Sequence, residues 1–166
     1  MAGGIDAVRN ELIDDCAIGR IIKMNGPIWL GLTKEVKSLR KYAHLSEIWG
    51  MVTRTAFEQL KCSSIVLLVT IIGMTVIYLM PPSALACGLI LGDYLLGLLG
   101  ALSWSIMTIA YVPTLRLYKQ PDWAAMSLPA AAILFSLMTV DSASRHWRKQ
   151  ASSWKDRTYN NNIAKL

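Results

Sequence analysis

One stretch, residues 63–140, limits most strongly what this chain of 166 residues can fold into. It is almost entirely apolar and makes up nearly half of the sequence. A water-soluble protein of this size has too small a core to bury so many Leu, Ile, Met and Ala side chains. The sequence therefore predicts that this half of the chain is surrounded by lipid.

The rest of the sequence divides around this membrane block, which ends at residue 141. Residues 1–44 are polar and mixed, residues 45–62 have a helical apolar pattern, and residues 142–166 are basic. We expect a mainly α-helical membrane protein with a small α/β part in front, an interface helix, and about two to four membrane segments.

The net charge of +6 is concentrated in the tail. Basic residues beside an apolar segment fit a patch on an anionic leaflet, and no nucleic-acid recognition motif accompanies them. The three cysteines have no metal-ligand spacing, so no metal site is expected. The basic residues of the tail are Arg145, Arg148, Lys149, Lys155, Arg157 and Lys165.

The front part predicts one helix and two strands. Apolar residues recur at helical spacing over residues 10–25, and Gly26, as a left-handed cap, with Pro27 would end the helix. The short apolar run 28–32 and the alternating run 35–40 predict strands.

A second helix is expected over residues 47–61, capped by Ser46. Its apolar residues share one face, which allows two interpretations. The helix lies on the bilayer surface with Trp49 at the headgroups, or it packs on the soluble part. The residues of this face are Ile48, Trp49, Val52, Ala56 and Leu60.

The membrane block predicts three apolar segments. Residues 64–80 are barely long enough to cross, and Pro81-Pro82 is expected to end them. Residues 83–112 form either one tilted helix or a short piece followed by a crossing from about Tyr94. Residues 123–140 form the third segment.

Two further residues mark breaks in this block. Asp93 is interpreted as an acid at the interface, with a functional role as the alternative. Pro113 is expected to end the second segment.

The charges do not fit three crossings. Arg116 and Lys119 predict that the turn after the second segment is cytosolic. Three crossings place the basic tail opposite the first sixty or so residues, yet its charge favours the cytosol. We therefore expect an integral protein of the inner (plasma) membrane, with the N-terminal region and the tail cytosolic. Either one segment is re-entrant or interfacial, or the long middle segment bends back.

The adjacent acids Asp14 and Asp15 are the sharpest candidates for chemistry. A carboxylate can act as a general base, and acids also suit the first turn of a helix. Residues alone do not separate these two interpretations.

The order of motifs resembles family 2 glycosyltransferases of the GT-A fold, and in particular their hopene-associated membrane subgroup. In those enzymes a Gly-Gly-aromatic-Asp turn comes before the acidic pair. This chain has Gly3-Gly4-Ile5-Asp6 before Asp14-Asp15, with Ile5 in place of the aromatic residue. The resemblance implies that Asp15 is the catalytic base and Asp14 the first acid of the pair.

Further segments extend the resemblance over almost the whole chain. Arg54 matches the arginine of a Gln-x-x-Arg-Trp element, from which Met51 and Thr55 depart. The resemblance implies substrate binding by Arg54, Trp154 and Arg157. The other similar segments are 26–32, 36–40, 111–116, 139–143, 145–148 and 154–159.

The resemblance implies an inverting transfer from a nucleotide-sugar to a membrane lipid, with a divalent cation on the diphosphate. The chain contains no Asp-x-Asp and resembles only the C-terminal part of such an enzyme. The nucleotide-sugar and the cation are therefore expected only with a separate donor-binding half, and this chain alone is expected to bind no cofactor and no nucleic acid. The alternative is a small non-catalytic anchoring or assembly protein of the membrane.

Overall fold

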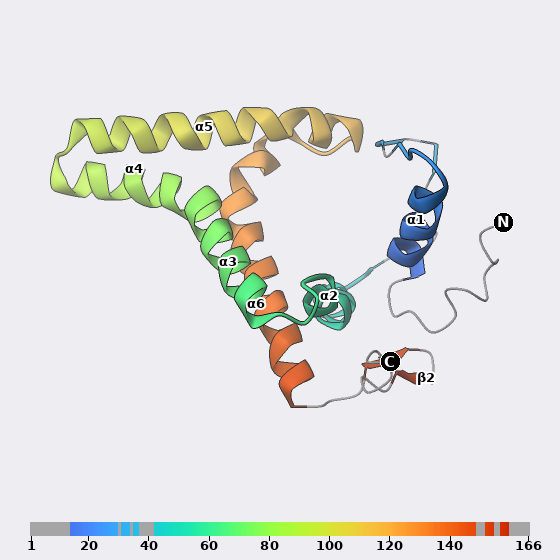
Figure 1. Ribbon diagram of the computed structural model, residues 1–166. Helices are drawn as coiled ribbons and strands as arrows, with labels where there is room; N and C mark the ends of the chain where they lie inside the picture. Colours follow the sequence, from blue (N-terminus) through green and yellow to red (C-terminus); the bar gives the residue numbers. More distant parts are fainter. Residues whose placement is uncertain are drawn as a thin grey trace. The chain divides into compact units, whose positions relative to one another are not determined.

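The structure is a computed structural model that describes residues 14–29, 31–33, 35–36, 42–148, 152–154 and 157–159 (Figure 1). The chain divides into two compact units. One unit combines Met1–Lys41 with Lys149–Leu166, and the other is Tyr42–Arg148. The described residues are mainly helical, as the sequence predicts.

The first unit contains helix α1, Asp14–Asn25, and a two-stranded antiparallel sheet in the tail. Strand β1 is Ser152–Trp154 and strand β2 is Arg157–Tyr159. The end of α1 agrees with the prediction, whereas residues 10–13 of the predicted helix lie outside the described residues.

The cap of α1 differs from the prediction. Gly26 does not have the positive φ of a left-handed cap. Instead, the side-chain amide of Asn25 donates a hydrogen bond of 2.8 Å to the carbonyl oxygen of Ile21. This bond satisfies one carbonyl that the end of the helix leaves free, and Pro27 cannot continue the helix.

The strand prediction for residues 28–32 is wrong for its described members, which form neither helix nor strand. Residues 35 and 36 of the second predicted strand are also irregular, and residues 37–40 lie outside the described part. Trp29 is 88% exposed and Val36 is 79% exposed. A strand needs a hydrogen-bonding neighbour and a surface to cover, and the described part of these segments has neither. The α/β part that the sequence predicts is therefore not seen there.

The second unit consists of five α-helices and two short helices of other types among its described residues. Figure 1 shows α4 and α5 running antiparallel, and α3 beside α6. The elements are α2, Leu45–Gln59; α3, Ser64–Met74; the π-helix η2, Thr75–Leu79; α4, Met80–Leu91; α5, Tyr94–Leu117; the 3-10 helix η3, Asp122–Ser127; and α6, Leu128–Trp147.

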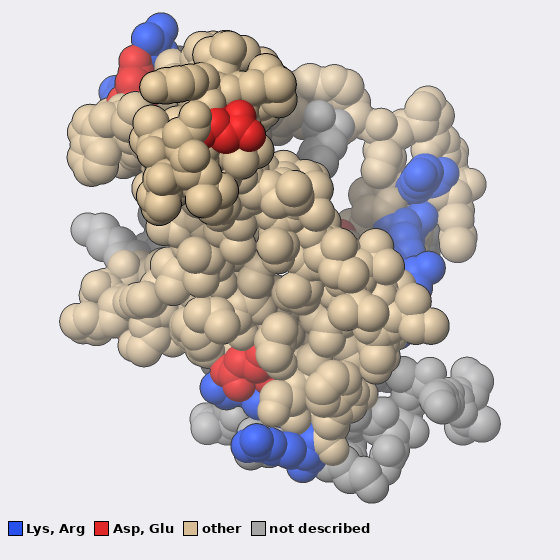
Figure 2. All heavy atoms as spheres, turned by 90° about the vertical axis from the view of Figure 1, so that its left-hand side faces the viewer, with Lys and Arg blue, Asp and Glu red and all other residues tan. Residues whose placement is uncertain are grey.

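Three stretches of this unit are long and apolar enough to cross a membrane: Ser64–Leu91, Tyr94–Leu117 and Asp122–Trp147. Most of their large apolar side chains are exposed in the protein. Figure 2 shows a broad surface over these helices that carries neither basic nor acidic side chains. The prediction of a helical membrane protein is thus supported by both composition and structure.

Helix α2 begins earlier than predicted, at Leu45 after an extended His44, and Ser46 is therefore inside the helix and not its cap. The side chain of Glu47 reaches back and accepts a hydrogen bond of 3.2 Å from the backbone N–H of Ala43. This bond ties the chain before His44 to the first turn of α2, and no described side chain caps the helix itself.

The prolines do not end the helices as predicted. Pro81-Pro82 lies in the first turn of α4, directly after η2, and Pro113 lies inside α5. Met80 donates its N–H to the carbonyl oxygen of Thr75, five residues back. The wider turn lets the helical run continue through the two prolines, which cannot donate hydrogen bonds themselves.

The middle segment is not one helix, because the chain breaks at Gly92-Asp93. Of the two alternatives for this segment, the one with a new helix from about Tyr94 gives the observed boundary. Gly92 has φ of 73° and ends α4 in the left-handed conformation. Asp93 begins α5, and its carboxylate accepts a hydrogen bond of 3.1 Å from the N–H of Leu96. Asp93 therefore has a structural role as a helix cap.

Glycines allow α4 and α5 to lie backbone against backbone. A Cβ atom on Gly88 would overlap the backbone nitrogen of Gly97 and lie 2.5 Å from its Cα atom. A Cβ atom on Gly100 would overlap the backbone of Leu85 and lie 2.8 Å from the carbonyl oxygen of Pro81. Such close approach is how helices associate where burial from water does not drive packing.

Candidate functional site

The acidic pair comprises the first described residues of α1. The carboxylate of Asp15 accepts a hydrogen bond of 2.7 Å from the backbone N–H of Cys16. Asp15 is exposed, and the side chain of Asp14 lies outside the described residues. The general-base interpretation and the helix-charge interpretation of this pair both stay predictions.

The other predicted site residues come from both units. Trp154 and Arg157 pair with each other across the β1–β2 hairpin. Their side chains lie outside the described residues. Arg54 lies in the middle of α2, in the second unit, and is half-buried. The structure thus brings Trp154 next to Arg157 and assigns Arg54 to a different unit.

The most tightly connected polar group of the described residues joins α2 to α6. The indole N–H of Trp49 donates a hydrogen bond of 2.7 Å to Oδ2 of Asp141. The guanidinium of Arg145, one helical turn further along α6, binds the same oxygen at 2.9 Å and 3.2 Å. One carboxylate oxygen therefore accepts three N–H groups and connects both helices.

The residue of α6 that follows Asp141 makes a second contact with α2. The hydroxyl oxygen of Ser142 accepts a hydrogen bond of 3.0 Å from the backbone N–H of Phe57. Thr53 is buried as well and donates its hydroxyl to the carbonyl oxygen of Trp49 at 2.8 Å. Small residues with satisfied hydroxyls let α2 and α6 approach closely.

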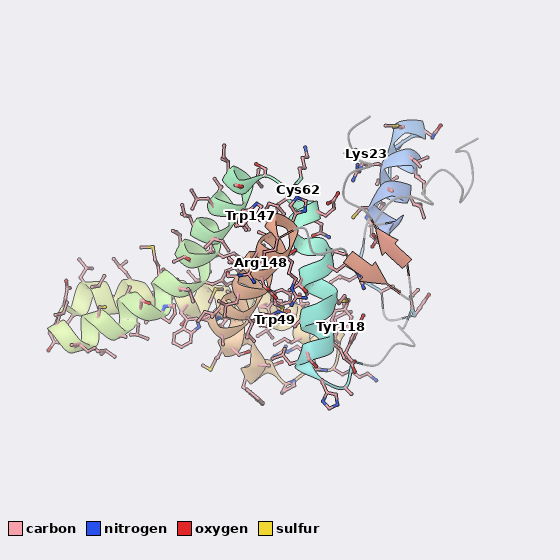
Figure 3. The ribbon with its side chains drawn as sticks, turned by 90° about the horizontal axis from the view of Figure 1, so that it is seen from below. Lys23, Trp49, Cys62, Tyr118, Trp147 and Arg148 are labelled. Carbon is pink, nitrogen blue, oxygen red and sulfur yellow. The ribbon has the colours of Figure 1, made fainter. Side chains whose placement is uncertain are left out.

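Aromatic rings close the end of this contact. The ring of Phe57, which is 2% exposed, meets His146 edge-on with centroids 5.2 Å apart and Trp147 with centroids 5.8 Å apart. Leu67 and Ala143 complete the apolar cluster around Phe57. Figure 3 shows Cys62 and Trp147 near one end of α2 and Trp49 farther along the same helix.

Cys62 lies at the edge of the same cluster, in the connection between α2 and α3. Its thiol donates a hydrogen bond of 3.2 Å to Oε2 of Glu58 and lies 4.0 Å from Nδ1 of His146. Burial, followed by the hydrogen bond and charge of Glu58, raises the pKa of Cys62 to about 11. The thiol stays protonated near neutral pH, so it is a weak nucleophile and a poor metal ligand.

We call this whole contact the α2–α6 junction; it was not predicted. In the sequence, Asp141 was predicted only as the end of the membrane block. The signal that could have indicated it is the i, i+4 pair Asp141 and Arg145 at the end of an apolar helix. The junction consists of Trp49, Thr53, Phe57, Glu58, Cys62, Asp141, Ser142, Arg145, His146 and Trp147.

The junction holds helices α2 and α6 together. Within the described ranges, no group of three or more His, Cys, Asp or Glu side chains could hold a metal ion. Comparisons with protein-family models, with curated proteins and with solved structures find no match for this chain.

Proposed function

We propose that this chain is the acceptor-side and membrane-anchoring portion of an inverting glycosyltransferase. It would act on a membrane lipid, with the sugar supplied from a nucleotide-sugar by a donor-binding half. The observation that carries the proposal is the position of the acidic pair. Asp15 is an exposed carboxylate among the first described residues of α1, and the motif order of family 2 enzymes gives this position to the base.

In this reaction Asp15 would take the proton of the acceptor hydroxyl as its oxygen attacks the anomeric carbon of the sugar. The nucleotide diphosphate leaves from the opposite side of that carbon, which inverts the configuration. A divalent cation held by the donor-binding half would stabilise the diphosphate.

The membrane helices support the acceptor part of the proposal. Their exposed apolar side chains require lipid, and a chain held in the bilayer meets lipid acceptors by diffusion in two dimensions. The segments 51–56 and 139–143, which carry part of the resemblance, lie on α2 and α6, and these helices are joined by Trp49 and Phe57 on either side of the first segment. Arg54, Trp154 and Arg157 remain the proposed substrate-binding residues, and the N-terminal region and the tail are proposed to face the cytosol.

The test is sugar transfer in native membranes with Asp15→Asn. We expect the rate of transfer from a radiolabelled nucleotide-sugar to extracted lipid to fall by about 100-fold or more, because general-base catalysis typically contributes that much. Glu35→Gln is the matched control, because Glu35 is also an exposed acid of the first unit. Transfer that is unchanged by Asp15→Asn, or equally reduced by Glu35→Gln, would refute the proposal.

A second candidate is a non-catalytic anchoring or assembly protein. The compact helical unit Tyr42–Arg148 favours it, because that unit has a polar junction and apolar helices of its own. Membranes that retain this chain and show no lipid glycosylation dependent on it would support this candidate and contradict the first.

A further inference from the structure

The structure places the start of the first apolar stretch next to the end of the third. Cys62, two residues before α3, lies 4.0 Å from His146 near the end of α6. Phe57 also contacts Trp147, the last residue of α6. Three crossings would separate these residues by the hydrocarbon core, which is about 30 Å thick. The three stretches therefore cannot all cross the membrane.

Helix α6 can cross by itself. It contains 20 residues, which is about 30 Å at 1.5 Å per residue. The turn before it carries the ion pair between Arg116 and Asp122, with the closest atoms 2.6 Å apart. Its other end carries Asp141 and Arg145. Charged groups thus mark both ends of the apolar stretch 123–140, which η3 and the first part of α6 together make about 30 Å long.

The chain must then make one more crossing before α6. Helix α3 and η2 lie along α6, and Leu67 of α3 packs with Phe57 near the end that carries the junction. Figures 1 and 3 both show the chain changing direction after α3, so that α4 leaves α6 and pairs with α5. The run α3–η2 therefore leads from the junction end of α6 towards the other end.

The paired helices α4 and α5 have apolar side chains on every side that does not face the partner helix. Helix α4 has no charged residue, and Arg116 near its end is the one charged residue of α5. A helix on the membrane surface has one polar face, whereas a helix that is apolar all round is surrounded by apolar material. Exposed residues of the pair include Leu89, Ile90, Leu91, Leu95, Leu98, Ile106 and Ile109.

We propose that the chain crosses the bilayer twice, through α3–η2 and through α6. In this arrangement the α4–α5 hairpin does not cross. It is embedded among the acyl chains of the leaflet farther from α2, with Gly92 and Asp93 at its tip. Both ends of the unit Tyr42–Arg148 then lie on one side of the membrane.

The distribution of charge agrees with this topology. The side of α2 and the tail carries Lys61, Arg145, Arg148 and the further basic residues after them, whereas the turn before α6 carries Arg116 and Lys119 with Asp122. The positive-inside rule, applied to the whole chain, assigns the larger basic group to the cytosol. The turn at Lys119 is then non-cytosolic, in contrast to the expectation from that turn alone.

The test is the accessibility of single cysteines to an impermeant maleimide in sealed membrane vesicles. The background is Cys16→Ser, Cys62→Ser and Cys87→Ser. Single cysteines are then introduced at Gln59, Tyr94, Gln120 and Gln150. We expect positions 59 and 150 to react from the same side and position 120 from the other side. Position 94, at the hairpin tip, is expected to react only from the side of position 120 or only after detergent is added.

Two results would overturn the proposal. Positions 59 and 150 reacting from opposite sides would mean an odd number of crossings. Position 94 reacting from the side of position 59 would mean that α5 crosses and that α3–η2 does not. If the variants fail to insert, the unsubstituted chain is tagged at both ends and treated with protease in sealed vesicles. Loss of both tags, or protection of both, is expected, and loss of one alone would overturn the proposal.

Discussion

The indole N–H of Trp49 binds the carboxylate of Asp141, 92 positions further along the chain, at 2.7 Å. The same oxygen is held by Arg145 from its own helix. This contact fixes the rotation of α2 about its axis, because Trp49, Thr53 and Phe57 then all face α6. The buried face of α2 is thus set by polar contacts as much as by apolar area.

Loss of the indole donor should loosen α2. Trp49→Phe keeps the aromatic ring and removes the N–H, so it should destabilise the unit by about 1.5 to 3 kcal/mol, the range for hydrogen bonds to charged groups. The measurement is the unfolding midpoint in detergent. Trp123→Phe serves as the control, because Trp123 is largely exposed. An equal shift in both variants would show that the contact with Asp141 contributes nothing.

The approach of α4 and α5 should not tolerate a methyl group at Gly88. Gly88→Ala places a Cβ atom against the backbone of Gly97, which cannot rotate away, so the helices must separate. We expect a loss of about 1 to 3 kcal/mol, as is typical of overpacking. The control is Gly73→Ala in α3, where no atom lies within 4 Å of the added Cβ. Unfolding midpoints that fall equally for both variants would contradict this packing.

The thiol of Cys62 should react slowly with alkylating reagents. Its pKa is raised from 9.0 to about 11, so its thiolate fraction at pH 8 is about 100-fold lower than that of an ordinary cysteine. The rate of alkylation by iodoacetamide is measured in a Cys16→Ser, Cys87→Ser background, with the denatured chain as reference. Glu58→Gln should increase the rate, because it removes a carboxylate that favours the protonated thiol. A native rate equal to the denatured one would refute the prediction.

The same group makes stability depend on alkaline pH. In the unfolded chain Cys62 loses its proton from about pH 9, whereas in the folded chain it holds the proton to about pH 11. The stability that this difference represents is present below pH 9 and is lost as the pH rises through 11. Cys62→Ser should reduce the loss of stability in this window, and an unchanged pH profile would count against the raised pKa.

The cap at the start of α5 should be replaceable by a side chain of the same hydrogen-bonding ability. Asp93→Ala removes the acceptor for the N–H of Leu96 and should cost about 1 kcal/mol. Asp93→Asn retains a side-chain oxygen and should restore most of the stability in a thermal unfolding assay. If Asp93→Asn is as unstable as Asp93→Ala, the negative charge and not the hydrogen bond is what this position requires.

The sequence was sufficient for features that depend on local residues. The apolar block and the end of α1 at Asn25 follow from composition and turn residues, whereas the start of α5 at Tyr94 was only one of two alternatives for the middle segment. The sequence was not sufficient where the structure of a segment depends on contacts with residues distant in the chain. The prolines at 81 and 113 were predicted to end helices, because the compensating π turn and the packing of neighbouring helices are not visible in a local pattern.

The candidate site shows the same division. Asp15 was predicted to lie in a helix that ends at Asn25, and the structure confirms that helix from Asp14 onward, whereas its role as a base stays a prediction. The junction was missed because hydrophobic periodicity selects Ile48, Val52 and Leu60, whereas Thr53 and Phe57 are the buried residues of α2. The buried face of α2 is the one that contacts Asp141 and Ser142 of α6. These residues are distant in the chain, so the sequence alone does not show the contact.

The connection between α2 and α3 has a mechanical consequence. Lys61 and Cys62 both have positive φ, and the N–H groups of Lys61, Cys62 and Ser63 all bind carbonyl oxygens of the last turn of α2. Such a connection is a stiff joint and not a free hinge. A shift of α2 would therefore move α3 with it. Spin-label distances between the two helices would stay constant during such a movement.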